Sequence, residues 1–243
     1  MRLIIVRHAD PDYSVDSLTP AGWKEAEALK ERFASLDADA YYVSPLGRAM
    51  DTARTALSGK GAEPVVKEWL REFNCPVKKP RLSYLDDDCC VWDWLPADWT
   101  ARPAFYDREK WMHEPELEAA GVSEKHEAVI RGFDDLLKEH GYERDGLNYR
   151  AVTPSHKTVV LFCHFGLECV LLAHLMNISP MILWHSTCSA PSGVTVVNTE
   201  EREQGIAAWR MAAFGDISHL YAKGIEPSFH ARFCECYTDE TIH

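Results

Sequence analysis

The sequence predicts an α/β fold: a three-layer sandwich with helices on both sides of a mostly parallel central sheet, and an inserted cap segment. Short β-branched apolar runs of strand length alternate with longer stretches of helix length. This alternation is typical of βαβ units, whose strands run parallel. The alternation stops between about residues 75 and 122 and then resumes, which indicates an insertion into one α/β domain spanning residues 1–243.

The first part of the chain contains two strand–helix units and the start of a third. The predicted elements are a strand at 2–6, a helix at 20–35, a strand at 39–43, a helix at 45–57 and a strand at 65–69. Thr19 and Ser44 each precede a proline, and a hydroxyl residue followed by proline favours a helix start. On the first helix we expect Trp23, Leu29 and Phe33 to face the core.

The second part of the chain returns to regular alternation after the cap. The predicted elements are a helix at 124–140, a polar connection at 142–155, a strand at 158–163, a helix at 166–176 and strands at 194–198 and 207–214. The last two strands have a short connection, which favours an antiparallel pair. The cap holds Trp92, Trp94, Trp99 and Trp111. These side chains either form the core of the cap or line a pocket beneath it.

Composition excludes several classes of protein. The 243 residues carry a formal charge of −12, and 46% of them are apolar, as in an ordinary globular protein. The negative charge argues against binding to nucleic acid, which depends on Lys and Arg. No apolar run approaches the ~20 residues of a membrane-spanning helix, and we see no signal peptide. We therefore expect a cytoplasmic protein without membrane partners; homo-oligomerisation stays open.

Four cationic or imidazole side chains follow predicted strands. Arg7 and His8 end the first strand, Arg48 lies in the first turn after the second, and His164 ends the strand at 158–163. Ligands of parallel α/β sheets bind at the carboxyl ends of the strands, so these four side chains can converge. Two guanidinium groups would repel a divalent cation but match phosphate oxygens. The set therefore predicts a phosphoryl group as ligand and no metal.

A phosphoryl transfer also needs a nucleophile and an acid. A neutral imidazole can attack phosphorus directly, and a second imidazole can stabilise charge on the oxygens. Glu72 follows the third predicted strand and is a candidate general acid, provided that burial raises its pKa. The cysteines at Cys89-Cys90 and Cys234-x-Cys236 lack the paired spacing of a zinc site.

These residues lie in motifs that resemble those of the histidine phosphatase superfamily, also called phosphoglycerate mutase-like, and more closely its phosphatases. The matching segments, in the family's order, are Arg7-His8-Ala9, the ten residues Ser44–Ala53, Leu70-Arg71-Glu72, His164-Phe165-Gly166 and Gly215–Leu220. Together they extend over nearly the whole chain. The ten-residue segment is the most specific of the five.

The resemblance implies a role for each matching residue. His8 would be the nucleophile that becomes phosphohistidine, and Arg7, Arg48 and His164 would complete the phosphate pocket. Glu72 would supply the proton to the leaving oxygen. The resemblance implies neither a metal nor an organic cofactor.

The sequence departs from the family pattern beside the nucleophile. Ala9 replaces the usual glycine, and Asp10-Pro11-Asp12 replaces a common Glu-Thr pair. Counted from Arg7, Ser14 stands where many members have a phosphate-contacting asparagine, so the resemblance implies Ser14 as a substrate-binding residue. These departures affect substrate contacts more than the central chemistry.

The sequence therefore predicts a metal-independent phosphomonoester hydrolase that acts on a small phosphorylated metabolite through a phosphohistidine. The cap would select the leaving group. One alternative is a phosphoglycerate mutase-type transfer, which would use the same residues. The other alternative is a non-catalytic phosphate-binding module, which would bind phosphate and leave its esters intact.

Overall fold

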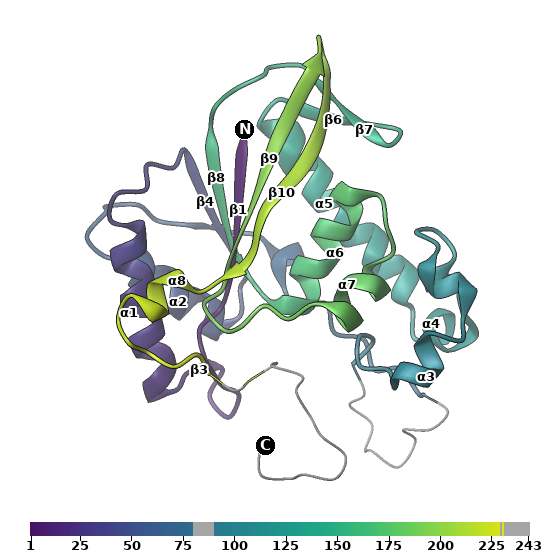
Figure 1. The fold of residues 1–243 in the computed structure, drawn as a ribbon, viewed down its shortest axis with the longest axis horizontal. Coiled ribbons are helices and arrows are strands. Elements are labelled where there is room, and N and C mark those ends of the chain that lie inside the picture. The colour runs from purple at the N-terminus through teal and green to yellow at the C-terminus, as the bar shows by residue number, and fades with distance from the viewer. Residues whose placement is uncertain (80–89, 229, 231–243) are drawn as a thin grey trace.

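A computed structural model describes residues 1–79, 90–228 and 230 of the chain. In it, helices cover both faces of one large sheet (Figure 1). Residues 80–89 of the predicted cap lie outside the described residues. Cys89, Cys234 and Cys236, considered above as zinc ligands, also lie outside them.

The central sheet has eight strands, and its order explains how distant segments meet. In spatial order the strands are β5 (Val65–Val66), β4 (Ala40–Val43), β8 (Thr158–Cys163), β1 (Arg2–Arg7), β9 (Val194–Glu203), β10 (Ile206–Asp216), β7 (Asn148–Ala151) and β6 (Tyr142–Asp145). The four strands from β5 to β1 pair in parallel, and the pairs from β1 to β6 are antiparallel. The predicted α/β fold with a parallel sheet at its core is confirmed, as is the antiparallel pair β9–β10.

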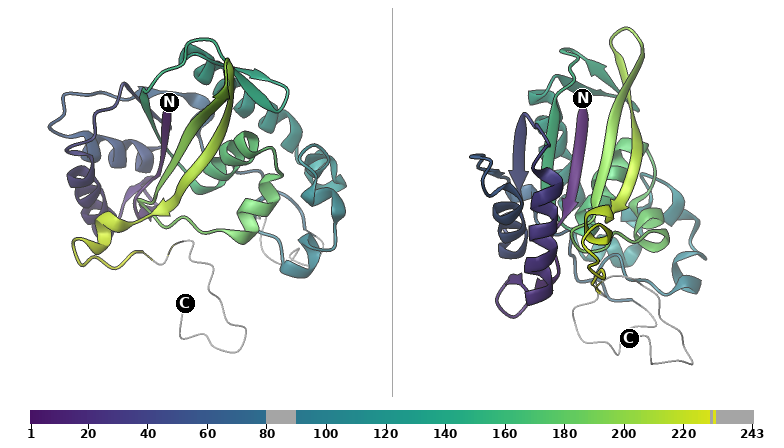
Figure 2. Two further views of the ribbon diagram at one scale, coloured as in Figure 1. Left: turned by 45° about the horizontal axis from the view of Figure 1, so that its top comes forward. Right: turned by 60° about the vertical axis from the view of Figure 1, so that its left-hand side comes forward.

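The helices lie in two layers (Figures 1 and 2). One layer holds α1 (Pro20–Phe33) and α2 (Gly47–Leu57); the other holds α5 (Val122–Glu139), α6 (Phe165–Met176) and α7 (Pro180–Ser186). Side chains alternate between the two faces of a strand. Ile4 and Val6 of β1 accordingly join the core beneath α1 and α2, whereas Leu3 and Ile5 join the core beneath α5 and α6.

Smaller elements complete the described chain. They are the two-stranded sheet of β2 (Pro11–Asp12) and β3 (Ser17–Leu18), the 3₁₀ turns η1 (Glu68–Leu70), η2 (Pro103–Tyr106) and η3 (Trp111–His113), and the short helices α3 (Pro96–Trp99), α4 (Pro115–Ala119) and α8 (Ser218–Tyr221). No helix within the described ranges is both long and apolar enough to cross a membrane.

The two predicted helix starts have different outcomes. Thr19 caps α1, because its hydroxyl accepts a hydrogen bond from the Gly22 N–H over 3.0 Å. The prediction that Ser44 caps the next helix is wrong. That helix begins at Gly47 after Leu46, without a side-chain cap. The backbone of Ser44 pairs with the sheet, since its N–H donates to the carbonyl of Phe162. Because Leu46 takes the N-cap position, the Ser44 hydroxyl does not cap α2.

Three further predictions need correction. The strand predicted at 65–69 ends at Val66 and continues as η1. The segment predicted as a polar connection forms the β6–β7 hairpin, in which Tyr142, Tyr149 and Ala151 are buried while polar side chains between them face outward. Trp23 is 41% exposed on α1 and does not face the core. A polar edge hairpin has too weak an apolar pattern to be distinguished from a loop by composition.

The described part of the cap packs onto the main core. Trp94 and Trp111 are buried and belong to the same apolar cluster as Leu3 and Ile5 of β1. The Trp111 ring meets the Trp184 ring of α7 edge-on, with centroids 5.4 Å apart. These two tryptophans are thus core residues, and the core that they join is shared with the sheet.

The Thr19 cap gives a direct test of how the first helix is fixed. Replacing Thr19 with Ala removes the acceptor for the Gly22 N–H and the hydroxyl that donates to Asp10 over 2.5 Å. We expect Thr19→Ala to lower the free energy of unfolding by about 1–2 kcal/mol, measured by urea denaturation. Thr19→Ser keeps the hydroxyl and should stay close to the wild type. Equal losses for both variants would contradict the role of the cap.

Candidate active site

The carboxyl ends of the four parallel strands bring five predicted residues together. Arg7 ends β1 and His8 follows it, while His164 joins β8 to α6. Arg48 lies in the first turn of α2 after β4, and Glu72 follows β5 and η1. We refer to Arg7, His8, Arg48, Glu72 and His164 as the sheet-edge cluster. Their convergence follows from the strand order β5-β4-β8-β1.

His8 is held in one orientation by the backbone. Its Nδ1 lies 2.8 Å from the carbonyl oxygen of Ala9. A carbonyl only accepts hydrogen bonds, so Nδ1 carries the proton and Nε2 keeps its lone pair. The main-chain N–H of His8 donates to Cys163 at the end of β8. The ring is therefore fixed with an unprotonated nitrogen available for attack.

His164 lies against His8 and is equally buried. The two ring centroids are 5.1 Å apart. His164 has no exposed surface, and its Nε2 lies 2.8 Å from the hydroxyl of Ser44. Ser44 thus fixes the second imidazole instead of capping a helix, which explains its place at the end of β4.

The two guanidinium groups have different supports. Arg7 is 4% exposed, donates to the Ser189 carbonyl over 2.6 Å, and lies over the Phe165 ring. Arg48 forms an ion pair with Asp16, with nitrogen and oxygen 2.6 Å apart. Arg7 is therefore fixed inside the fold, whereas Arg48 is held from a loop at the surface.

Glu72 is bound at the N-terminus of α6. Its Oε1 accepts from the N–H groups of Phe73 at 2.7 Å and Leu167 at 2.9 Å. Burial raises the pKa of Glu72, and these two hydrogen bonds oppose the increase. The condition set by the sequence, a carboxyl group whose pKa is raised by burial, is met.

Burial has the opposite effect on the two imidazoles. It lowers the pKa of both His8 and His164 well below the ordinary value, and the nearby Arg7 and Arg48 lower each pKa further. Both rings therefore stay neutral under mildly acidic conditions. A neutral His8 is nucleophilic, as the proposed chemistry requires.

Ser14 has no contact with the sheet-edge cluster among the contacts that the structure describes. It is exposed on the loop between β2 and β3, and its hydroxyl donates to Asp12 over 2.5 Å. The substrate-binding role implied by the resemblance stays a prediction.

Several residues around the cluster were missed by the sequence reasoning. Tyr13, adjacent to Ser14, has its ring 5.3 Å from the Arg48 guanidinium. Asp16 binds both Arg48 and the N–H of Gly47, and has a positive φ of 48°.

Trp92 lies beside Gly166, since a Cβ added to that glycine would fall within 2.7 Å of the indole nitrogen. None of these residues has a distinctive sequence pattern.

The C-terminal part of the described chain returns to the same region. The His230 Nδ1 lies 2.7 Å from a carboxylate oxygen of Asp10, two residues after the nucleophile. Ser228 donates to the same carboxylate.

His219, part of the last family-like motif, lies 3.0 Å from the Ser192 hydroxyl. The N–H of Ser192 in turn donates to the His8 carbonyl. His219 of that motif therefore acts on the backbone of His8 through Ser192.

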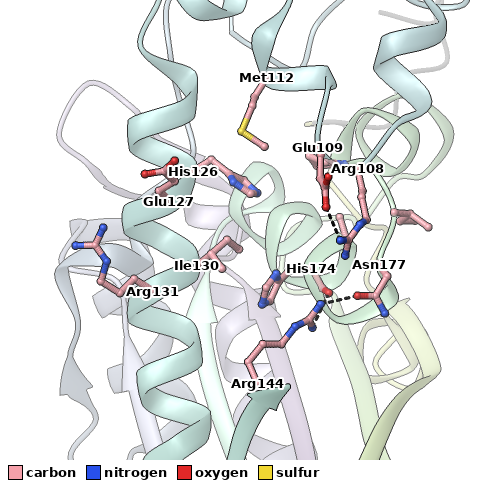
Figure 3. A pocket seen from close by; sticks show the side chains of 13 residues that line it. Arg108, Glu109, Met112, His126, Glu127, Ile130, Arg131, Arg144, His174 and Asn177 are labelled. Carbon is pink, nitrogen blue, oxygen red and sulfur yellow. Dashed lines mark hydrogen bonds and ion pairs between the residues drawn. The ribbon is translucent and has the colours of Figure 1, made fainter. Parts of the chain in front are cut away.

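A hollow of about 450 Å³ lies between α5, α6, η3 and β6 (Figure 3). Three of its charged side chains are engaged, since Arg144 donates to Asn177 and Arg108 pairs with Glu109. It shares no residue with the sheet-edge cluster. Within the described chain, no group of three or more His, Cys, Asp and Glu residues is arranged to bind a metal ion. The reactive side chains converge at the sheet edge, which is the candidate active site.

The fold and the cluster together define an α/β protein whose buried arginine and histidine side chains converge at the carboxyl edge of its parallel strands. The model of the histidine phosphatase superfamily (branch 1) matches residues 3–212. The chain therefore belongs to the histidine phosphatase superfamily, as its motifs indicated. Membership makes it an enzyme of the phosphatase or mutase type. No curated protein sequence matches the chain significantly.

Solved structures share the fold at low sequence identity. A mutant phosphoserine phosphatase from Entamoeba histolytica, in complex with phosphoserine, is 18% identical with a TM-score of 0.57, covering 90% of this chain and 98% of that one. A mycobacterial glucosyl-3-phosphoglycerate phosphatase is 20% identical with a TM-score of 0.59 over 88% and 98%. The alpha-ribazole phosphatase of Shigella flexneri is 18% identical with a TM-score of 0.55 over 89% and 97%.

The lowered pKa values of the two buried imidazoles can be measured. Proton NMR of the ring C–H groups should show His8 and His164 as neutral from pH 8 to below pH 6, with the signals assigned from His8→Ala and His164→Ala. An unfolded histidine binds a proton near pH 6.5. These rings should therefore reduce stability as the pH falls below about 6.5. Titration of either ring near pH 6.5 would contradict the burial argument.

Proposed function

We propose that this protein is a metal-independent phosphomonoester hydrolase acting on a small phosphorylated metabolite through a phosphohistidine at His8. The observation that supports this most is the buried His8–His164 pair, with ring centroids 5.1 Å apart, close to the charges of Arg7 and Arg48. The two guanidinium groups suit the phosphate oxygens. His8 offers a neutral Nε2 for attack, because its Nδ1 proton is bound by Ala9.

In the first step, the Nε2 lone pair of His8 forms a bond to phosphorus while the ester P–O bond breaks. The leaving oxygen takes the proton of Glu72, so that the product is a neutral alcohol and Glu72 becomes a carboxylate. Arg7, Arg48 and His164 stabilise the charge on the phosphoryl oxygens. In the second step, water attacks phosphorus, its proton goes to Glu72, and the P–N bond breaks.

The two pKa shifts make this chemistry possible at one pH. An ordinary histidine is neutral only above about pH 6.5, and an ordinary glutamic acid keeps its proton only below about pH 4.3. In water no pH would favour both states. Burial lowers the pKa of His8 and raises that of Glu72, so the two required protonation states overlap.

The substrate class follows from the limited positive charge of the site. Two arginines provide cations for one phosphate, whereas the chain as a whole carries −12. A large polyanion would be repelled by the remaining surface, and a small phosphate ester would not. Trp92, beside Glu72 and Gly166, and Tyr13, beside Arg48, are the residues that we expect to contact the leaving group.

The nucleophile can be tested by trapping. A panel of phosphorylated metabolites is assayed with EDTA present, and a labelled substrate is quenched with alkaline detergent during turnover, because the P–N bond of phosphohistidine is stable to base and labile to acid. We expect label on His8 in the wild type and a loss of activity of at least about 10³-fold in His8→Ala, because the covalent route is removed. Loss of wild-type activity in EDTA would contradict the metal-free mechanism, and near-normal turnover of His8→Ala would contradict the nucleophile.

The same panel separates the alternative functions. A hydrolase releases inorganic phosphate with water as the only acceptor. Transfer of the label to a second substrate hydroxyl, dependent on a bisphosphorylated primer, would establish a mutase instead. Binding of phosphate with no turnover of any ester would leave only a phosphate-binding module.

The role of Glu72 predicts a dependence on the leaving group. Glu72→Gln should lower kcat by about 10²–10⁴ for an alkyl phosphate. The loss should be much smaller for p-nitrophenyl phosphate, whose leaving oxygen needs little protonation. In the wild type, kcat/KM should fall as rising pH removes the Glu72 proton. Equal losses on both substrates would indicate that Glu72 is structural.

A further inference from the structure

A second carboxyl group lies inside the fold near the sheet-edge cluster. Glu168 is in the first turn of α6 and has no exposed surface. It takes no part in the reaction proposed above. An ionised carboxylate out of water is costly unless a cation or hydrogen-bond donors compensate for it. The neighbours that can compensate the charge of Glu168 are the hydroxyls of Thr195 and Ser189 and the Arg7 guanidinium.

The compensation of Glu168 from hydrogen bonds is weak. Neither carboxylate oxygen accepts a hydrogen bond of good geometry within the described chain, although the hydroxyls of Ser189 and Thr195 lie beside them. Thr195 already accepts from the N–H of Gly215 over 2.9 Å. The Thr195 hydroxyl keeps its own proton for Glu168, so Thr195, Arg7 and Ser189 share the compensation of this carboxylate.

The nearby charge is that of Arg7. The Arg7 guanidinium interacts electrostatically with Glu168, and it donates to the carbonyl of Ser189, whose hydroxyl faces Glu168. Arg7 is itself buried, and its Nε has no hydrogen-bond partner within the described residues. Arg7 also interacts with Tyr13 and Glu72, so Glu168 supplies one part of the compensation that this buried cation receives.

Arrival of a phosphate changes the balance of charge. In the empty site, Arg7 and an ionised Glu168 cancel, and Arg48 is cancelled by Asp16. A dianionic phosphate adds two negative charges next to Arg7, at a place where His8 and His164 are neutral. Like charges in a poorly solvated region disfavour each other's ionisation.

We infer that Glu168 is a positioning residue, an internal counter-ion of Arg7 beside Glu72, and that it takes up one proton when a phosphate dianion binds. The proton comes from solvent water. The inference rests on the proposed phosphate pocket and adds to it a proton-coupled binding step. The pKa of Glu168 is raised to about 7 by burial, so this proton uptake falls in the physiological range.

The other titratable groups around Glu168 can be separated from it. Cys163 of β8 and Cys169 of α6 have pKa values raised well above the ordinary thiol value by burial, so they stay protonated. Cys188 interacts with Arg7 from the loop before β9. Glu72 interacts with both Glu168 and Arg7. Glu72 and Cys188 are therefore the groups that need control variants.

The experiment measures the binding of sulfate, which stays a dianion over the whole pH range used. Calorimetry in buffers of different ionisation enthalpy counts the protons taken up by the wild type, Glu168→Gln, Glu72→Gln and Cys188→Ser between pH 6 and 9. We expect the wild type to approach one proton per sulfate above pH 7, with an affinity that falls by up to tenfold per pH unit. Glu72→Gln and Cys188→Ser should keep most of this dependence.

Glu168→Gln keeps the shape of the side chain and removes its ionisation. We expect it to bind sulfate without proton uptake, and with an affinity that stays constant between pH 7 and 9. Should this variant fail to fold, Ser189→Ala should move the midpoint of the wild-type dependence to higher pH, because it removes a hydroxyl beside the carboxylate.

The outcomes separate a failure of the role of Glu168 from a failure of the proposed phosphate pocket. Sulfate binding without proton uptake in the wild type would overturn the role of Glu168 and leave the phosphate pocket intact. Loss of the pH dependence in Glu72→Gln alone would also overturn it, by assigning the proton to Glu72. If the wild type does not bind sulfate, or Arg48→Ala binds it equally well, both the pocket and the inference fail.

Discussion

Arg7 lies at the end of β1 with 4% of its surface exposed, and the rest of the site is arranged around that buried cation. Water cannot screen its charge, so neighbouring protein groups must respond to it. The Ser189 carbonyl accepts its hydrogen bond, and burial together with the Arg7 charge lowers the pKa of His8. Because these effects act over short distances in a poorly solvated region, a change in one charge alters the ionisation of the others.

The sheet topology is what allows a cation to be buried there. Parallel strands β4, β8 and β1 end side by side, and each is followed by a chain segment that covers the edge. The N-terminus of α6 presents the Leu167 N–H to Glu72, so that a carboxyl group remote in sequence is bound beside the imidazoles. The helix end favours negative charge, which limits how far burial can raise the pKa of Glu72.

How much of this could be predicted from sequence depended on the kind of signal. Residues 159–163 form an unbroken apolar run after Thr158, so both the strand and the position of His164 after it could be predicted. Glu168 gave no such signal, because one acidic residue in an apolar helix is equally compatible with solvent. Its burial depends on β9 and the Ser189 loop, which are remote in sequence. The β6–β7 hairpin was missed because its strands lie at the polar edge of the sheet.

The buried cluster opposes folding, and this follows from the directions of its pKa values. Lowered values at His8 and His164 reduce stability as the pH falls below about 6.5, where unfolded histidines take up protons. Raised values at Glu72 and Glu168 reduce stability as the pH rises above about 4.3, where unfolded glutamates lose protons. The two ranges overlap, so no pH relieves both. The apolar cores on the two faces of the sheet must offset this cost, and a bound phosphate would offset part of it by pairing with Arg7.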